Sequence, residues 1–104
     1  MYRGTTPNIV IYIPDKVDAE NITALKFMMA QDGKVVITKE LSQFTKDGQK
    51  FSLRLTITET NSLDASADKN EWQLRGKIGD IYFASKKVEF DVDDVLDGGV
   101  EFNA

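Results

Sequence analysis

The sequence predicts an all-β protein built as an antiparallel sandwich of two sheets, with about seven strands. Apolar and polar residues alternate along most of the chain, as they do in half-buried strands. Asp-Gly and Gly-Asp pairs, which favour tight turns, recur between the alternating segments. The length of 104 residues suits one domain, which we expect to span residues 1–104. A small closed barrel is the competing architecture.

The first alternating segment is PNIVIYIP, residues 7–14, which lies between two prolines. Proline cannot donate to a strand ladder, so each one marks an end of the predicted strand. Three isoleucines share the side that we expect to face the core: Ile9, Ile11 and Ile13. Tyr12 points to the other side.

The next two segments predict a hairpin. In ALKFMMAQ, residues 24–31, the inward positions are Leu25, Phe27 and Met29. Met28 then lies on the opposite face. Asp32-Gly33 is a strong signal for a two-residue turn, and KVVITKEL, residues 34–41, returns as the partner strand.

Asp47-Gly48 marks a second turn before KFSLRLTI, residues 50–57, which has the clearest alternation. Its inward positions are Phe51, Leu53, Leu55 and Ile57. Thr56 and Glu59 then have the spacing of a capping box, in which a hydroxyl and a carboxylate close the first turn of a helix. We therefore expect a short helical turn near residues 57–68, in the crossover from one sheet to the other.

The last strands follow this crossover. EWQLRGKI, residues 71–78, and IYFAS, residues 81–85, flank Gly79-Asp80 and predict a hairpin. KVEFDV, residues 87–92, closes the sheet structure, with the inward positions Val88, Phe90 and Val92. Regular turn spacing over about seven short strands favours an immunoglobulin-like sandwich, as an architecture rather than as a true antibody domain.

Outward aromatic and sulfur-containing side chains are the candidate contact residues. Trp72 is expected in the core. Tyr82 alternates with Phe83 and should face solvent, as should Tyr12 and Met28. We predict Tyr12, Met28 and Tyr82 as contacts for a partner, because apolar residues on both faces of a sheet indicate that something covers the outer one.

The acidic stretch EFDVDDVLDGG, residues 89–99, raises the question of a calcium site. A helix–loop–helix calcium loop with Gly98 at its sixth position would begin at Asp93 and place Val95 at a ligand position. An irregular site would need converging carboxylates from Asp91, Asp93, Asp94 and Asp97. We expect instead hydrated side chains on a final strand and its exit turn, since outward charge protects edge strands.

The composition argues against most catalytic chemistry. Cys and His are both absent, so the chain has no thiol nucleophile, no thiolate zinc site and no imidazole base. No glycine-rich phosphate loop occurs either, and we expect no catalytic residue, no metal and no cofactor. The formal net charge is −4 and the basic residues are spread along the chain, so nucleic acid is not an expected partner.

Short motifs at both ends of the chain carry a family resemblance. YRGTTP, residues 2–7, precedes an apolar strand, and DVLDGGV occupies residues 94–100. With Gln-Leu-Arg at 73–75 and Ala-Ser at 84–85, they resemble small proteins encoded in prophages of Gram-positive gut bacteria. These are similar in pattern to the N-terminal sandwich domain of phage baseplate upper proteins, which attaches a receptor-binding arm to the tail. NSLDASADKN, residues 61–70, departs from that pattern as an insertion.

The resemblance implies a structural or adaptor role in a phage tail or baseplate, without catalytic residues. Its expected partners are other phage structural proteins or further copies of the chain, in the virion or the bacterial cytoplasm. The sequence shows neither a signal peptide nor an apolar segment of the roughly 20 residues that span a bilayer, so a membrane is not expected. Two alternatives stay open: a glycan- or peptide-binding module that uses Tyr82, and a phage-encoded inhibitor whose negative charge suits a basic groove in a host enzyme.

Overall fold

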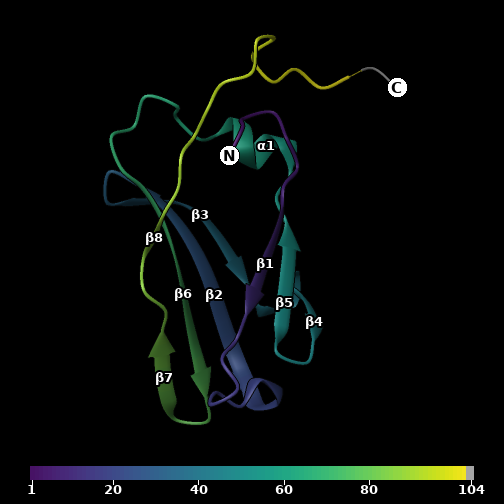
Figure 1. Cartoon of the computed structure of the whole chain (residues 1–104), viewed down its shortest axis with the longest axis vertical. Helices are drawn as coiled ribbons and strands as arrows, with labels where there is room; N and C mark the ends of the chain where they lie inside the picture. Colours follow the sequence, from purple (N-terminus) through teal and green to yellow (C-terminus); the bar gives the residue numbers. More distant parts are fainter. Residues whose placement is uncertain (103–104) are drawn as a thin grey trace.

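The computed structural model describes residues 1–102, which form two antiparallel sheets and one short helix (Figure 1). The three-stranded sheet has the order β1-β5-β4, with β1 (Asn8–Tyr12), β5 (Lys50–Arg54) and β4 (Thr45–Asp47). The five-stranded sheet has the order β3-β2-β6-β7, with β3 (Lys34–Glu40), β2 (Ile22–Gln31), β6 (Asn70–Ile78) and β7 (Ile81–Ala84). Its fifth strand, β8 (Val88–Glu89), pairs with β6 beyond the end of β7.

The prediction of a mostly β, sandwich-like fold is thus confirmed in its coarse form. The immunoglobulin-like connectivity is not confirmed, because β2 and β3 form a hairpin within one sheet. In an immunoglobulin domain the second and third strands belong to different sheets. The sequence reading also missed β4, whose three residues are all exposed and carry no hydrophobic alternation.

The three predicted hairpin turns are present. Asp32 and Gly33 both have positive φ, 51° and 82°, as a two-residue turn between twisted strands requires. Gly48 connects β4 to β5, and Gly79 connects β6 to β7. Two 3-10 turns, η1 (Ala19–Asn21) and η2 (Leu41–Gln43), complete the connections.

The inner faces of the two sheets share one hydrophobic core. Its buried members include most of the residues predicted to point inward: Ile13, Leu25, Phe27, Met29, Phe51, Leu53, Leu55 and Val92. Trp72 packs on this core with its ring centroid 5.4 Å from that of Phe27, as predicted. Val88 and Ile57 are the exceptions. Val88 is exposed, because the two-residue strand β8 lies at the edge of its sheet, away from the three-stranded sheet (Figure 1). Ile57 is half-buried and lies beyond the end of β5.

The predicted capping box begins α1 (Ile57–Asn61), in the crossover between the sheets. Glu59 N–H donates to Thr56 Oγ1 at 3.1 Å, and Thr56 N–H donates to Glu59 Oε1 at 2.8 Å. The strand predicted to reach residue 57 therefore ends at Arg54, and Ile57 becomes the first residue of the helix. The box competes with the sheet ladder for the backbone N–H groups, which ends the strand early.

The same glutamate joins α1 to the five-stranded sheet. Glu59 Oε2 lies 2.5 Å from Nζ of Lys39, a buried residue of β3. Burial would raise the pKa of the Glu59 carboxyl, but the hydrogen bonds from Lys39 and Thr56 outweigh it, and the pKa lies below its usual value. This ion pair neutralises the Lys39 ammonium and fixes α1 over the end of the sandwich.

Gln31 holds the segment between α1 and β6 in place. This segment is part of residues 61–70, the insertion relative to the prophage proteins that the sequence resembles. The buried Gln31 side chain donates from Nε2 to Asp64 O and to Asn70 Oδ1, both at 2.8 Å. Its Oε1 accepts from Asp64 N–H at 3.0 Å. A buried amide with its donor and acceptor both engaged gives this crossover a defined path over the β2–β3 hairpin.

The acidic stretch after β8 lies beside the first residues of the chain. Asp93 N–H donates to Met1 O at 2.9 Å, and Arg3 N–H donates to Asp93 O at 2.8 Å. The Arg3 guanidinium donates to Asp94 Oδ1 and to Asn61 O, each at 2.7 Å, and Asn61 Nδ2 donates to Gly99 O at 2.8 Å. We call Arg3, Asn61, Asp94 and Gly99 the Arg3 clamp, because together they hold the acidic stretch against α1.

The four aspartates of the acidic stretch do not converge on a shared site. Asp91, Asp93, Asp94 and Asp97 are exposed, as predicted for hydrated side chains. Asp94 nevertheless pairs with Arg3, and Asp97 Oδ1 accepts from Gly99 N–H at 2.9 Å. In residues 1–102 no three acidic side chains lie close enough together to hold a metal ion.

Replacement of Gly4 should show how closely the clamp is packed. A Cβ on Gly4 would lie 2.4 Å from Gly99 Cα, whereas a Cβ on Gly98 meets nothing within 4 Å. Both glycines have φ near +75° (74° and 75°), so Gly98→Ala is a matched control for backbone strain. We expect Gly98→Ala to cost about 1–2 kcal/mol of unfolding free energy, and Gly4→Ala at least about 1 kcal/mol more. Urea unfolding measures both, and equal losses would contradict the close approach.

The Lys39–Glu59 pair should make stability depend on pH. The folded pKa of Glu59 is lowered, so its contribution is complete above the unfolded value of about 4.3 and is lost as pH falls through the lower folded value. We expect Glu59→Gln to cost roughly 1–3 kcal/mol near neutral pH, and the difference from wild type to shrink in acid. Glu20→Gln, which loses an exposed partner 3.8 Å from Lys46, is the control and should change little. An equal loss of unfolding free energy in Glu59→Gln at every pH would contradict the lowered pKa of Glu59.

Candidate functional site

The structure places the three predicted contact residues on two different surfaces. Tyr12 is 72% exposed on the outer face of the three-stranded sheet. Tyr82 is 62% exposed on β7, and Met28 is half-buried on β2; both belong to the five-stranded sheet. Tyr12 therefore does not share a surface with the other two, and the five-stranded sheet offers the larger candidate.

The strand register assembles the outer face of this sheet. Lys26 of β2 pairs with Arg75 of β6, and the next outward pair is Ala24 with Lys77. Lys77 in turn pairs with Tyr82 of β7. Because directly paired residues point to the same face, Lys26, Arg75, Lys77 and Tyr82 gather on one side of the sheet.

Phe83 fixes the orientation of β7. It pairs with Gly76 and its ring covers that glycine, so that a Cβ there would lie 2.3 Å from Phe83 Cζ. Phe83 packs against the core, and alternation then turns Tyr82 outward. The absence of a side chain at Gly76 is what allows the far end of the Phe83 ring to approach β6 so closely.

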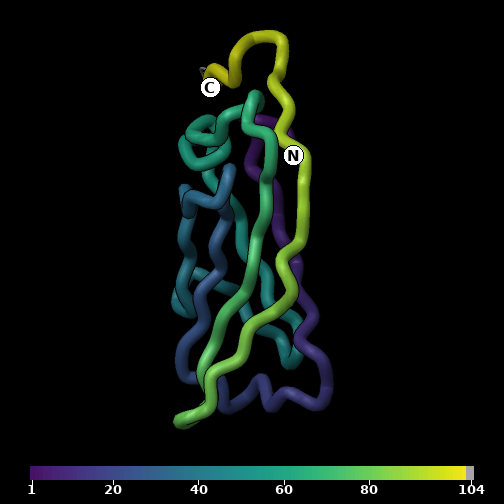
Figure 2. Tube along the Cα trace, turned by 90° about the vertical axis from the view of Figure 1, so that its left-hand side faces the viewer, coloured from purple at the N-terminus to yellow at the C-terminus, as the bar shows by residue number. Residues whose placement is uncertain are grey.

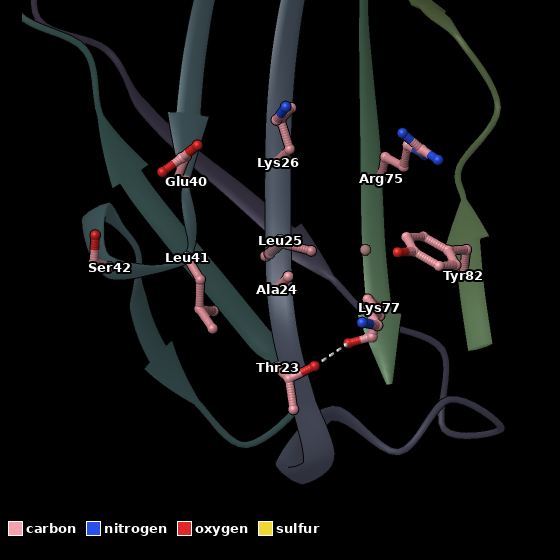
Figure 3. Close-up of a pocket in the computed structure, with 11 residues that line it drawn as sticks. Thr23, Ala24, Leu25, Lys26, Glu40, Leu41, Ser42, Arg75, Lys77 and Tyr82 are labelled. Carbon is pink, nitrogen blue, oxygen red and sulfur yellow. Dashed lines mark hydrogen bonds between the residues drawn. The ribbon is translucent and has the colours of Figure 1, made fainter. Parts of the chain in front are cut away.

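A pocket of about 360 Å³ lies on this face (Figure 3). Its lining comes from β2, β6, β7 and the β3–η2 junction: Thr23, Ala24, Leu25, Lys26, Glu40, Leu41, Ser42, Arg75, Gly76, Lys77 and Tyr82. Figure 3 shows the Tyr82 ring reaching from β7 toward β6, with Arg75 on one side of it and Lys77 on the other. The volume falls within the range of pockets that accept small ligands or single anchoring side chains.

The Tyr82 ring holds two cations in place. Arg75 Cζ lies 5.3 Å and Lys77 Nζ 5.4 Å from the ring centroid, both within cation–π range. Neither of them, nor Lys26, forms an ion pair with another residue of 1–102. Glu40 lines the same pocket; its backbone N–H donates to Gln43 Oε1 at 2.9 Å, and it pairs with Lys26 across the β2–β3 ladder.

These features define what the pocket can bind. Three cations face one carboxylate, so the local charge is positive in a chain whose net charge is −4. The Tyr82 ring and Leu41 supply apolar surface, and Thr23 and Ser42 supply hydroxyl groups. The pocket therefore suits an acidic group attached to an apolar body, such as an acidic peptide segment or an acidic sugar.

The sequence predicted that Tyr82 faces solvent, but not the cations on the same face. The basic residues are spread along the chain, but pairing of β2 with β6 brings Lys26 beside Arg75. The useful signal was the spacing of Arg75 and Lys77 by two residues, which puts both on the face away from Leu74. Their partner Lys26 could not be placed without the strand register.

Met28 lines a second, smaller pocket of about 170 Å³ on the same sheet. Its other walls include Trp72, Gln73, Val35 and Lys87. Met28 pairs with Gln73, one step along the sheet from the Lys26–Arg75 pair. The two pockets thus follow each other along β2 and β6, and a partner that covers one would lie near the other.

Comparison with known proteins assigns the chain to no family. No protein-family model, curated protein or solved structure matches the chain. Across residues 1–102, no helix has the length and apolar character needed to cross a bilayer.

Proposed function

We propose that the chain is a non-enzymatic structural or adaptor protein that works through protein–protein contact at the Tyr82 pocket. The observation that carries this proposal is a pocket with three cations that form no ion pair in residues 1–102, two of which lie over the ring of the exposed Tyr82. Tyrosine and arginine are the residues that most often dominate binding energy at protein interfaces. The resemblance of YRGTTP and DVLDGGV supports a place in a phage or prophage tail or baseplate.

The construction of the site supports a contact surface better than a reaction centre. The pocket contains Lys, Arg, Tyr, Ser and Thr side chains, without a second carboxylate to act beside Glu40. Glu40 itself is the N-cap residue of η2. Rigid strands that present aromatic and cationic side chains are suited to recognition of a complementary surface.

Mass spectrometry of purified particles tests the structural role. A bacterium that carries the gene is induced, and its particles are purified by density gradient. We expect peptides of this chain at a constant ratio to the tail proteins across independent preparations. Material from the same gradient fractions of an uninduced culture is the control, and consistent absence of the chain from particles would contradict the proposal.

The Tyr82 pocket also favours a second function, a glycan- or peptide-binding module. An aromatic ring beside two cations can stack on a sugar or a peptide group while it pairs with an acid. The acidic character expected of the ligand follows from the charge of Lys26, Arg75 and Lys77.

An array of acidic and neutral glycans and peptides tests this second function. We expect binding to acidic members, lost in Tyr82→Ala and kept in Tyr12→Ala, which removes another exposed tyrosine from the other sheet. The loss should be about tenfold or more, as for a residue that dominates a contact. Binding that is indifferent to Tyr82→Ala, or the absence of binding, would rule out this function.

A further inference from the structure

Residues 95–102 project from one end of the sandwich (Figure 1). We call them the projecting segment. Leu96, Val100 and Phe102 within it are exposed, and nothing in residues 1–102 covers them. Three large apolar side chains on one short exposed segment indicate a surface that is buried against a partner.

The Arg3 clamp fixes where the projecting segment leaves the fold. Asp94 precedes it and is held by Arg3, while Gly99 within it is held by Asn61. Asp97 closes the turn by accepting from Gly99 N–H. Leu96 is therefore presented from an ordered turn beside α1, which lowers the entropy lost when a partner binds it, and Val100 and Phe102 follow directly after this turn.

The Tyr82 pocket lies toward the opposite end of the molecule. Figures 1 and 2 show residues 95–102 at one end of the long axis and the β6–β7 hairpin at the other. The molecule extends 45 Å along that axis. From Gly99, which Asn61 holds beside α1, Glu101 and Phe102 can reach at most about 11 Å. The segment cannot fill the pocket of its own copy.

The two surfaces complement each other in charge and chemistry. The projecting segment contains Asp97 and Glu101 and neither Lys nor Arg. The pocket contains Lys26, Arg75 and Lys77, with Tyr82 and Leu41 as apolar walls. An acidic group attached to an apolar body is the ligand that the pocket suits, and Glu101 beside Phe102 has that composition.

We propose that the projecting segment of one copy docks in the Tyr82 pocket of a second copy. The inference deepens the proposed function by naming the partner of the same pocket, and it rests on that function. Each copy keeps a free pocket at one end and a free segment at the other, so the contact is head-to-tail and generates a ring or a filament. In a tail or baseplate, this contact would build a repeating arrangement of copies.

Sedimentation of the purified chain over a range of concentrations tests the proposal. We expect wild type to form species larger than a dimer as concentration rises, and less so at high salt, because the contact is partly ionic. The pocket variant Arg75→Ser/Tyr82→Ala and the segment variant Leu96→Ser/Phe102→Ser should each associate about tenfold or more weakly. Tyr12→Ala should associate like wild type. All of these positions are exposed, and urea midpoints confirm that each variant folds.

Mixing the two variants identifies the contact as head-to-tail. The segment variant has an intact pocket and the pocket variant has an intact segment, so an equimolar mixture should form a dimer and nothing larger. Dimers of the pocket variant alone would overturn the proposal in favour of segment-to-segment contact. A wild type that stays monomeric at all concentrations would also overturn it, while its presence in induced particles would leave the proposed function standing.

Discussion

The pairing register of β2 on β6 is the constraint on which the rest of the structure depends. Phe27 opposite Leu74 and Met29 opposite Trp72 supply the inner face of the wider sheet. The alternate positions, Lys26 and Arg75, are thereby turned outward. A shift by one residue would bury charge and expose the aromatic core, so burial of the inner side chains holds the outer surface in place. The core and the candidate site therefore lie on opposite faces of the same pair of strands, β2 and β6.

Two sets of polar contacts join segments that strand pairing does not connect. The Lys39–Glu59 pair joins β3 to α1, and the Arg3 clamp joins the acidic stretch to the start of the chain. Both converge on α1, so this short helix organises one end of the sandwich although it contributes little core surface itself. The opposite end, which carries the Tyr82 pocket, contains strand ends, the β6–β7 turn and the 3-10 turns η1 and η2. This difference between the ends gives the molecule a direction, which head-to-tail assembly requires.

Local patterns in the sequence predicted every strand except β4, the turns and the capping box of α1, because each depends on residues near in sequence. The alternation of Phe51, Leu53 and Leu55 is one example, and the spacing of Thr56 and Glu59 is another. Contacts between distant residues could not be predicted in this way. The sheet order, the pairing of Lys39 with Glu59 and the meeting of Lys26 with Arg75 all depend on long-range register. Alternation predicted the outward orientation of Tyr82, whereas the positions of Lys26, Arg75 and Lys77 around one pocket could be seen only in the fold.

Nuclear magnetic resonance measurement of the β2–β6 register tests the account most directly. Cross-strand nuclear Overhauser effects should connect the backbone of Lys26 with that of Arg75, and that of Met28 with that of Gln73. This result would place the cations and Tyr82 together on the solvent face. Effects that instead connect Lys26 with Leu74 would show a register shifted by one residue. Lys26 and Arg75 would then not share the outer face, and the function proposed for the Tyr82 pocket would be contradicted.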